Sequence, residues 1–450
     1  MNKVSQSWGK TLPPSWQVVK ISDVFTVGRG VSDTRILARL ENAEGPCPVY
    51  SLDSVRSGRY EPEMWICRED TKAQKAAMLK PGDFLVRTQG NVGEYWIVPE
   101  GVTPGLCSNR YIMILRPSEA IDSTFFRFLL DRELGGLLYE QLNENADSVY
   151  VGKTAHLRRA DGHSVRMLRF PLPSITEQRE IAAALLDVER HTGDLIEMIG
   201  ASVKLQQSLR KKEITRALTV GIRKTEDPKD GGEDPVGPVG NEWRIERLLD
   251  VCAGIDLAVP RSGYKTMSKM QDSGEKKDLL NYRIKDVFAN YFGGAVEYLD
   301  ERMYADPKKN VLTAGDLLTS RRVRGNEYYG RAEVIPEGIR KGVFDSDLFR
   351  IRANEDVLPV WAIAYLFNET DIIRNQIETS SNYLSVAQMR GVRIPVIPKE
   401  YQQEVREYIE DRISVFDNLI SEKNALIENL RRYRKRISIE YVTGKKRVMR

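Results

Sequence analysis

The chain of 450 residues contains one sequence plan twice. The stretch FPLPSITEQREI of residues 170–181 recurs as IPVIPKEYQQEV of residues 394–405. Three pairs of identical residues are separated by the same offset in the two stretches: Pro171 and Pro395, Gln178 and Gln402, Glu180 and Glu404. A repeat of this length constrains the fold more than any local pattern does, because two copies of one plan form two copies of one structural unit.

Further matches extend the repeat over most of the chain. The matched positions are Trp16 and Asp23 with Trp243 and Asp250, Gly82 and Asp83 with Gly315 and Asp316, and Pro99 to Gly101 with Pro336 to Gly338. The offset varies from one match to the next, which indicates loop insertions and deletions between the copies. The chain is therefore interpreted as an internal duplication.

Each half has a strand-rich part followed by a long helix. Short apolar runs such as FLVRT and DLLTS are bounded by Gly, Pro and Asp, and short helical patterns interrupt them, so we expect compact α+β domains. The segment TEDPKDGGEDPVGPVGN is too rich in proline and glycine for continuous structure and is predicted to be a linker. The expected boundaries are domains at 1–170 and 242–392, helices at 171–224 and 393–450, and a linker at 225–241.

Both long segments carry apolar residues mostly three or four apart, which places them in a stripe on one helix face. At 1.5 Å per residue, a helix of this length extends roughly 60–70 Å and cannot bury its stripe against a small domain alone. One isolated stripe is more often a core helix or a homodimeric coiled coil. Two matched copies favour packing of each helix against its twin as an antiparallel coiled coil. Proline ahead of the first turn stiffens the join without loss of a helical hydrogen bond.

Composition excludes several classes of protein. Hydrophobic residues at 41% and charged residues at 29% are typical of globular chains, and a net charge of +4 excludes a uniformly cationic binder. The four cysteines have no zinc-site spacing, and the apolar runs are too short for a membrane span. We expect a cytoplasmic protein.

No catalytic or metal-binding constellation emerges from the sequence. The motif VGKT lacks the first glycine of a phosphate-binding loop, since Asp147 stands at that position. The three histidines have no metal or triad spacing. The two Gly-Asp pairs precede apolar runs and are interpreted as turns. We therefore predict no catalytic and no metal residues.

Polar and basic loops instead indicate contact with DNA. Arginine pairs with guanine edges or phosphates, asparagine with adenine, and tyrosine packs on sugar or base. The candidate DNA-binding residues are Arg87, Gln89 and Asn91, then Lys153, Arg158 and Arg159, and in the second copy Arg321, Arg322, Arg324, Asn326, Tyr328 and Arg331. For each of them, ordinary solvated charge is the alternative. At the basic helix ends 208–216 and 431–436, compensation of the helix dipole is at least as good an explanation as DNA contact.

The duplicated joins PLPSITEQREIAAAL and IPVIPKEYQQEVREYI, the helices after them, the GDxL segments and the ends LTVGIRK and YVTGKKRV resemble the specificity subunit of type I restriction-modification enzymes. The second join departs from the first at Tyr401, which stands in the place of Glu177. The resemblance implies a non-catalytic, sequence-specific DNA-binding subunit of a system for restriction and DNA methylation. Two target-recognition domains would each read one part of a bipartite site, and the paired helices would set the unread gap.

The same resemblance implies partners: double-stranded DNA, two methyltransferase subunits and restriction/translocase subunits, with no membrane. The chain would have no cofactor of its own, since the partners would use S-adenosylmethionine, ATP and magnesium. The main alternative is a duplicated coiled-coil scaffold that binds proteins and no nucleic acid. An enzyme of unrecognised chemistry, and the recognition subunit of a system with fused methylation and cleavage partners, are further alternatives.

Overall fold

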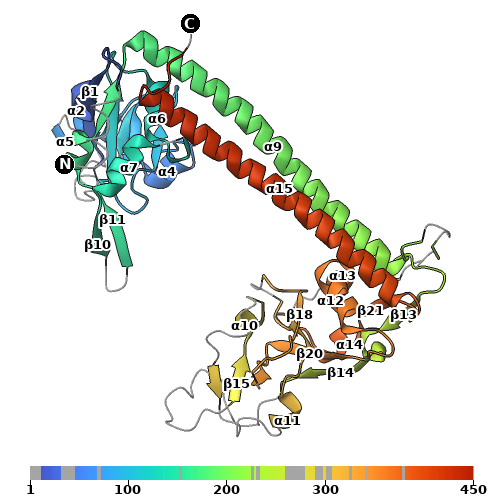
Figure 1. Cartoon of the computed structure of the whole chain (residues 1–450). Coiled ribbons are helices and arrows are strands. Elements are labelled where there is room, and N and C mark those ends of the chain that lie inside the picture. The colour runs from blue at the N-terminus through green and yellow to red at the C-terminus, as the bar shows by residue number, and fades with distance from the viewer. Residues whose placement is uncertain are drawn as a thin grey trace. The chain divides into compact units, whose positions relative to one another are not determined.

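A computed structural model of the chain describes residues 12–31, 46–67, 72–134, 136–151, 155–223, 228–229, 234–258, 279–288, 297–299, 307–323, 327–340, 342–377 and 381–448 (Figure 1). The chain divides into two compact units. The first unit comprises Met1–Gly200 and Asn424–Arg450, and the second comprises Ala201–Lys423. In the described ranges, none of the helices is both long and apolar enough to span a lipid bilayer.

The first unit is built on two four-stranded sheets and a two-stranded ladder. One antiparallel sheet has the order β2 (Phe25–Arg29), β9 (Ile112–Pro117), β6 (Phe84–Arg87), β7 (Tyr95–Ile97). The other has the order β4 (Met64–Cys67), β3 (Pro46–Tyr50), β8 (Gly105–Cys107), β5 (Met78–Leu79). Strand β1 (Gln17–Lys20) pairs with β12 (Arg169–Leu172), and β10 (Asp147–Val151) forms a hairpin with β11 (Ala155–Arg159) that projects from this unit in Figure 1.

Short helices accompany the two sheets, and some of them enclose an aromatic core. They are α2 (Ile21–Val24), α4 (Leu52–Arg56), α5 (Lys72–Ala77), α6 (Ser123–Leu130), the 3-10 turn Arg132–Leu134, α7 (Leu137–Glu144) and α8 (Gly162–Met167). The ring of Phe126 on α6 lies 4.3 Å from that of Phe25 and 5.0 Å from that of Phe84, measured between centroids. Burial of such rings is among the largest apolar contributions a small domain obtains.

The second unit repeats this architecture. Its four-stranded sheet has the order β14 (Cys252–Leu257), β20 (Leu348–Ala353), β17 (Leu317–Ser320), β18 (Ala332–Val334). The further sheet has the order β16 (Glu297–Leu299), β15 (Leu279–Tyr282), β19 (Gly342–Phe344), and β13 (Arg244–Arg247) pairs with β21 (Arg393–Val396). Its short helices are the 3-10 turn Leu248–Val251, α10 (Ile284–Phe288), α11 (Pro307–Asn310), α12 (Val360–Asn368), α13 (Ile372–Gln376) and α14 (Val386–Gly391). The predicted internal duplication of an α+β domain is confirmed.

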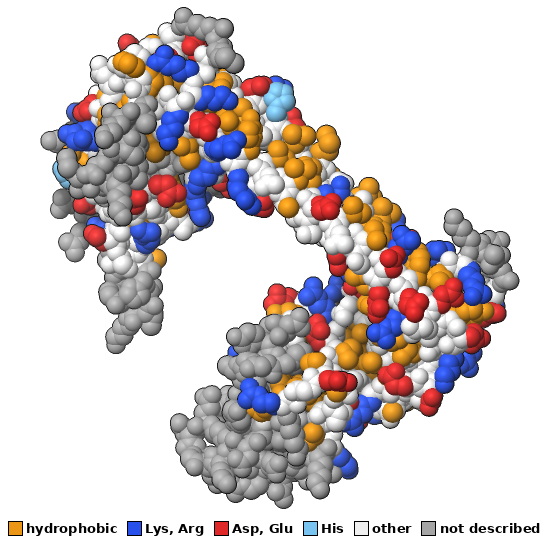
Figure 2. Space-filling view, in the orientation of Figure 1, with side chains coloured by type: hydrophobic (Ala, Val, Ile, Leu, Met, Phe, Trp, Pro, Cys, Tyr) orange, Lys and Arg blue, Asp and Glu red, His pale blue; other side chains and the backbone are white. Residues whose placement is uncertain are grey.

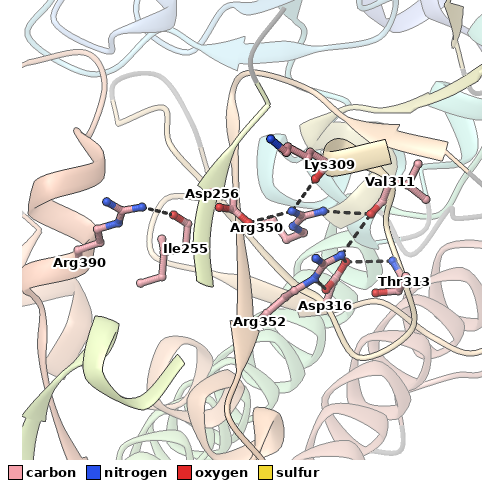
Figure 3. Close-up of polar contacts among 9 residues, drawn as sticks. All are labelled: Ile255, Asp256, Lys309, Val311, Thr313, Asp316, Arg350, Arg352 and Arg390. Atoms are coloured by element: carbon pink, nitrogen blue, oxygen red, sulfur yellow. Dashed lines mark hydrogen bonds and ion pairs between the residues drawn. The ribbon is translucent and has the colours of Figure 1, made fainter. Parts of the chain in front are cut away.

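The Gly-Asp pairs are structural turns, as predicted. Gly82 and Gly315 have φ values of 82° and 85°, which glycine adopts without strain. The buried Asp83 accepts hydrogen bonds from the Lys80 backbone N–H at 2.8 Å and from Arg116 Nε at 2.8 Å. In the second unit Asp316 accepts from the Thr313 N–H at 2.9 Å and from Arg352 Nε at 2.7 Å (Figure 3). The same ion pair therefore holds the same turn to the same sheet in both units.

Two long helices, α9 (Ile175–Thr219) and α15 (Gln402–Val442), contribute to both units. In the second unit Tyr408 Oη donates to Glu213 Oε1 at 2.9 Å, and Arg210 Nε lies 3.2 Å from Asp417 Oδ1. These contacts join early residues of α15 to late residues of α9, so the helices are antiparallel. In the first unit Ile437 of α15 belongs to the same apolar core as Ile181 and Leu185 of α9. The predicted antiparallel helix pair is confirmed.

A buried glutamine fixes the direction in which each long helix leaves its domain. Gln178 is fully buried; its Nε2 donates to the carbonyls of Ala120 and Pro173 at 3.0 Å each, and its Oε1 accepts from the Asp122 N–H at 2.8 Å. Gln402 makes the two corresponding donations, to Val357 and Ile397. The shared glutamine of the two joins is thus a structural anchor, because a buried amide is costly unless it is hydrogen-bonded.

The difference between the joins has a structural reason. In the first unit Trp16 Nε1 donates to Glu177 Oε2 at 3.0 Å. In the second unit Trp243 Nε1 donates to the Leu218 carbonyl at 3.0 Å, and its ring stacks on Tyr401 with centroids 5.7 Å apart. Tyr401 therefore supports the second tryptophan by stacking where Glu177 supports the first by a hydrogen bond.

Each long helix is followed by a glycine that packs against one of these tryptophans. Gly221 follows α9 with φ 98° and packs against Trp243, and Gly444 follows α15 with φ 71° and packs against Trp16. A positive φ at this position is the usual glycine ending of a helix. Within the predicted linker, Val236 and Val239 are buried in the core of the second unit, so part of that segment packs on the domain.

Candidate nucleic-acid interface

In the first unit three segments that are distant in sequence meet beside the end of β6. The backbone N–H of Thr88 donates to the Tyr111 carbonyl at 2.8 Å, and the N–H of Gly90 donates to the Arg158 carbonyl at 2.9 Å. Gln89 forms an isolated antiparallel bridge with Arg159. The loop after β6, the turn before β9 and the strand β11 are therefore fixed against one another by backbone hydrogen bonds.

Five exposed arginines gather around this junction: Arg29, Arg110, Arg158, Arg159 and Arg166, here called the basic cluster. Their contacts link them, since Arg29 Nε donates to the Arg110 carbonyl at 2.6 Å and the Arg159 guanidinium lies 5.6 Å from the Tyr111 ring centroid. Arg110 lies 4.8 Å from the same centroid. Arg166 donates from Nη2 to the Val27 carbonyl at 3.3 Å, and Arg158 donates to the Asn143 carbonyl.

No member of the basic cluster forms an ion pair with a carboxylate in the part of the chain that the structure describes. The cations on the long helices differ in this respect. Arg210 forms ion pairs with Glu369 and Asp417, and Lys211 with Asp371. The basic helix ends thus bind acidic side chains of their own unit, whereas the basic cluster keeps its charge available for an anionic partner.

Most of the predicted DNA-binding residues of the first half that the structure describes lie at the junction, and one shapes the loop beside it. Gln89, Arg158 and Arg159 lie at the junction, and the exposed Asn91 lies in the loop beside them. Arg87 donates from Nε to the Gln89 carbonyl at 2.8 Å and from Nη1 to Glu94 Oε2 at 3.0 Å, so it shapes this loop from within. Lys153 lies outside the described residues.

Sequence reasoning missed Arg29, Arg110, Tyr111 and Arg166. Arg110 and Tyr111 belong to the stretch SNRYI, whose Ser-Asn-Arg start could have identified a polar turn before a buried strand. Arg29 and Arg166 carry no comparable signal. They reach the cluster only because β2 pairs with β9 and α8 packs beside β2.

The second unit forms the corresponding junction. The Leu384 N–H donates to the Arg321 carbonyl at 2.9 Å, the Val323 N–H donates to the Asn382 carbonyl at 2.9 Å, and Arg322 bridges Tyr383. The Arg321 guanidinium lies 5.3 Å from the Tyr383 ring centroid, and its Nε donates to the Leu384 carbonyl at 3.0 Å. An arginine that packs on a tyrosine ring thus recurs at the same junction. In the second unit, however, the arginine follows β17 and the tyrosine lies in the segment before α14.

The other predicted residues of the second half have diverse roles. The Tyr328 ring stacks on Phe288 with centroids 5.0 Å apart, so this ring packs within the domain. Arg331 is exposed directly before β18, and its carbonyl accepts from Thr319 Oγ1 at 2.6 Å. Arg324 and Asn326 lie outside the described residues. Arg390 on α14 donates to the Ile255 carbonyl (Figure 3). This contact is the counterpart of that from Arg166 to Val27.

Comparison with known proteins agrees with this architecture. Residues 13–205 match the type I restriction modification DNA specificity domain. The chain is 22% identical to the type I restriction enzyme MjaVIII specificity subunit of Methanocaldococcus jannaschii, with 98% of this chain and 95% of that protein covered. It is 21% identical to the putative type I restriction enzyme MjaX specificity subunit of the same organism, with 97% and 95% covered.

A solved structure concerned with complex assembly and conformational transition of the type I R-M system has the same fold. Its chain superimposes with a TM-score of 0.66 at 18% identity, covering 97% of this chain and 99% of that one. The duplicated domains and the antiparallel helices agree with these similarities: residues 13–205 match a type I DNA specificity domain, and nearly the whole chain is similar to specificity subunits of type I restriction enzymes.

Proposed function

We propose that this chain recognises a bipartite DNA site, with each half reading one part of it. The observation that carries the proposal is the junction beside β6 and β17, which recurs in both units and presents arginine and tyrosine side chains in each. Guanidinium groups bind phosphates and guanine edges, and tyrosine packs on sugar or base. Arginines of the basic cluster would supply phosphate contacts that position the domain, and other side chains at the junction would discriminate base pairs.

The long helices would set the gap between the two parts of the site. Each helix is uninterrupted, with 45 residues in α9 and 41 in α15, and each contributes to both units. At 1.5 Å per residue these lengths correspond to roughly 60–70 Å. A paired helix is stiff compared with a flexible linker, so its length would translate into a fixed number of unread base pairs.

The partners would dock on an apolar face of the helices. Nine large apolar side chains of α9 and α15 are exposed in this chain: Leu186, Leu195, Met198, Leu205, Leu209, Val415, Leu419, Leu426 and Tyr433. Figure 2 shows hydrophobic side chains along the helices. The spacing of Leu195 and Met198 in the first unit, and of Leu205 and Leu209 in the second, places each pair on one face of its helix segment.

The internal repeat supports binding of two copies of the partner subunit that would dock on the long helices. Leu195 and Leu209 of α9 correspond to Leu419 and Tyr433 of α15 under the repeat that relates Gln178 to Gln402, and all four are exposed. Matched apolar positions in both units would offer two equivalent surfaces, one for each methyltransferase subunit. Those subunits would bring S-adenosylmethionine, and restriction/translocase subunits would bring ATP and magnesium. This chain would contribute recognition and no catalytic group.

If the methyltransferase subunit docks on these apolar side chains, negative charges introduced among them should weaken its binding. The double substitution Met198→Glu and Leu205→Glu should reduce co-purification of the methyltransferase subunit at least about tenfold, because an unpaired charge at an interface costs several kcal/mol. The change should leave the fold intact, since both side chains are more than half exposed, at 67% and 57%. The control Val18→Glu alters another exposed apolar residue, at 44%, on strand β1. Equal recovery of partner with both proteins would contradict docking at this face.

The function itself is tested by mapping modified bases genome-wide in a host with and without the gene. We expect one split DNA motif to be methylated only when the gene is present together with its methyltransferase partner. A continuous motif, or no change in the methylated motifs, would refute the proposal.

A further inference from the structure

The turns before β9 and β20 occupy equivalent places in the two units. The Ser108 N–H donates to the Tyr50 carbonyl and the Asp345 N–H donates to the Tyr282 carbonyl, each at 3.0 Å. At the other end of each turn, the carbonyl of Tyr111 accepts from the Thr88 N–H and that of Asp347 accepts from the Arg321 N–H, each at 2.8 Å. Both turns are therefore held at the two junctions described above.

The chemistry of the two turns is opposite. The first has the sequence Ser-Asn-Arg-Tyr at 108–111, and the second has Asp-Ser-Asp at 345–347, one residue shorter. The shortening removes the counterpart of Arg110 and places Asp347 where the first unit has Tyr111. Guanidinium groups only donate hydrogen bonds, and an ionised carboxylate only accepts them.

In the first turn the donors converge on one ring. The guanidinium groups of Arg110 and Arg159 lie 4.8 and 5.6 Å from the Tyr111 centroid, and Arg110 Nη2 donates to Tyr111 Oη at 2.7 Å. Contact with the ring and its hydroxyl limits the orientations of Arg110 and leaves its remaining N–H groups directed elsewhere. An oriented guanidinium is suited to the paired acceptors O6 and N7 on the major-groove edge of guanine.

In the second turn a carboxylate keeps unused acceptor capacity. Asp347 is partly buried, and no side chain among the described residues donates a hydrogen bond to its carboxylate. Partial burial, together with the charge of Asp345, raises the pKa of Asp347. The nearby cations Arg322 and Arg321 only partly offset this rise in pKa. At a junction that contacts DNA, a carboxylate would be repelled by phosphates but could accept a hydrogen bond from a base amino group.

Resting on the proposed function, we infer that Arg110 and Asp347 are specificity-determining residues of opposite kind. Arg110 reads a guanine in one half-site, and Asp347 accepts a hydrogen bond from the N4 amino group of a cytosine in the other. The two halves of the duplicated chain thus acquired different targets by exchanging a donor for an acceptor at one turn, while the hydrogen bonds that hold the turn remained the same.

The inference is tested on the full chain purified with its methyltransferase subunits, using selection from a randomised duplex library followed by sequencing. Arg110→Ala should reduce the preference for one G·C pair in one half-site roughly tenfold or more, and leave the other half-site unchanged. Asp347→Asn should relax a cytosine position in the other half-site alone. Arg110→Lys keeps the charge but loses the paired donors, so it should retain affinity and still lose the guanine preference.

Two exposed residues supply controls, Arg59→Ala in the first unit and Asp356→Asn in the second, and neither should change the selected motif. Selected motifs that are identical for wild type, Arg110→Ala and Asp347→Asn would overturn the inference and leave the proposed function intact. A change confined to adenine or thymine positions would also overturn it. A wild-type complex that selects no motif at all would instead refute the proposed function.

Discussion

Simultaneous replacement of Arg158 and Arg159 by alanine should weaken binding of the assembled complex to its DNA site on the order of 100-fold at physiological salt. Each charge-assisted hydrogen bond of a guanidinium with DNA contributes about 1–3 kcal/mol, and the effects of removing two of them multiply in the dissociation constant. In a plot of the logarithm of affinity against the logarithm of salt concentration, the slope should also become shallower by about one for each phosphate that the variant no longer binds. Fluorescence anisotropy with a labelled duplex over a range of salt concentrations measures both quantities.

The matched control replaces Arg179 and Arg190 by alanine. These residues lie on α9 in the same unit, with side chains 72% and 66% exposed, and removing them changes the net charge by the same amount. A long-range effect of net charge would weaken binding equally in both double variants, whereas direct binding of DNA at the junction affects only the first. An unchanged salt dependence for the Arg158 and Arg159 variant would contradict phosphate binding by these residues.

Lengthening both long helices should change the target itself. Insertion of seven helix-forming residues after Gly200 and of seven after Lys423, where the two units divide, adds about two helical turns. The added length is about 10 Å, and at about 3.4 Å per base pair the gap between the half-sites should grow by about three base pairs. Mapping of methylated sites should recover the same two half-sites at the new spacing.

The insertion has a direct control and a clear contrary outcome. The same seven residues placed after Asp230, outside both helices, should leave the spacing unchanged. Methylation at the original spacing by the variant with two lengthened helices would show that the helices do not set the gap. Loss of one half-site with the spacing retained would also contradict this role.

The parts of this fold that the sequence predicts are those with strong and repeated signals. The joins at Gln178 and Gln402 are visible as a repeat, and the structure shows why both carry glutamine: each amide side chain donates to a carbonyl in the segment that precedes the long helix. The turns at Asp83 and Asp316 follow from glycine, which accepts a positive φ, next to a carboxylate that accepts from the backbone.

The candidate site was only partly predictable, because tertiary structure decides which charges are free. Arg87 and Tyr328 look like binding residues in the sequence, yet one pairs with Glu94 and the other stacks on Phe288. Arg29 and Arg166 carry no binding signal in the sequence and join the basic cluster through strand pairing and helix packing. Single-sequence patterns register residue type and spacing, whereas the availability of a charge depends on neighbours distant in the chain.

The packing of the end of α15 against Trp16 affects the order in which the two units fold during synthesis. The first unit includes Asn424–Arg450, and its core contains Ile437 and Val442, so it lacks part of its interior until these two residues leave the ribosome. The second unit is continuous in sequence and is complete earlier. At about 5–20 residues per second, the N-terminal domain would wait on the order of tens of seconds for its final helix. During synthesis the later-encoded half should therefore reach its native state first, and truncation near the C-terminus should damage the half that was translated first.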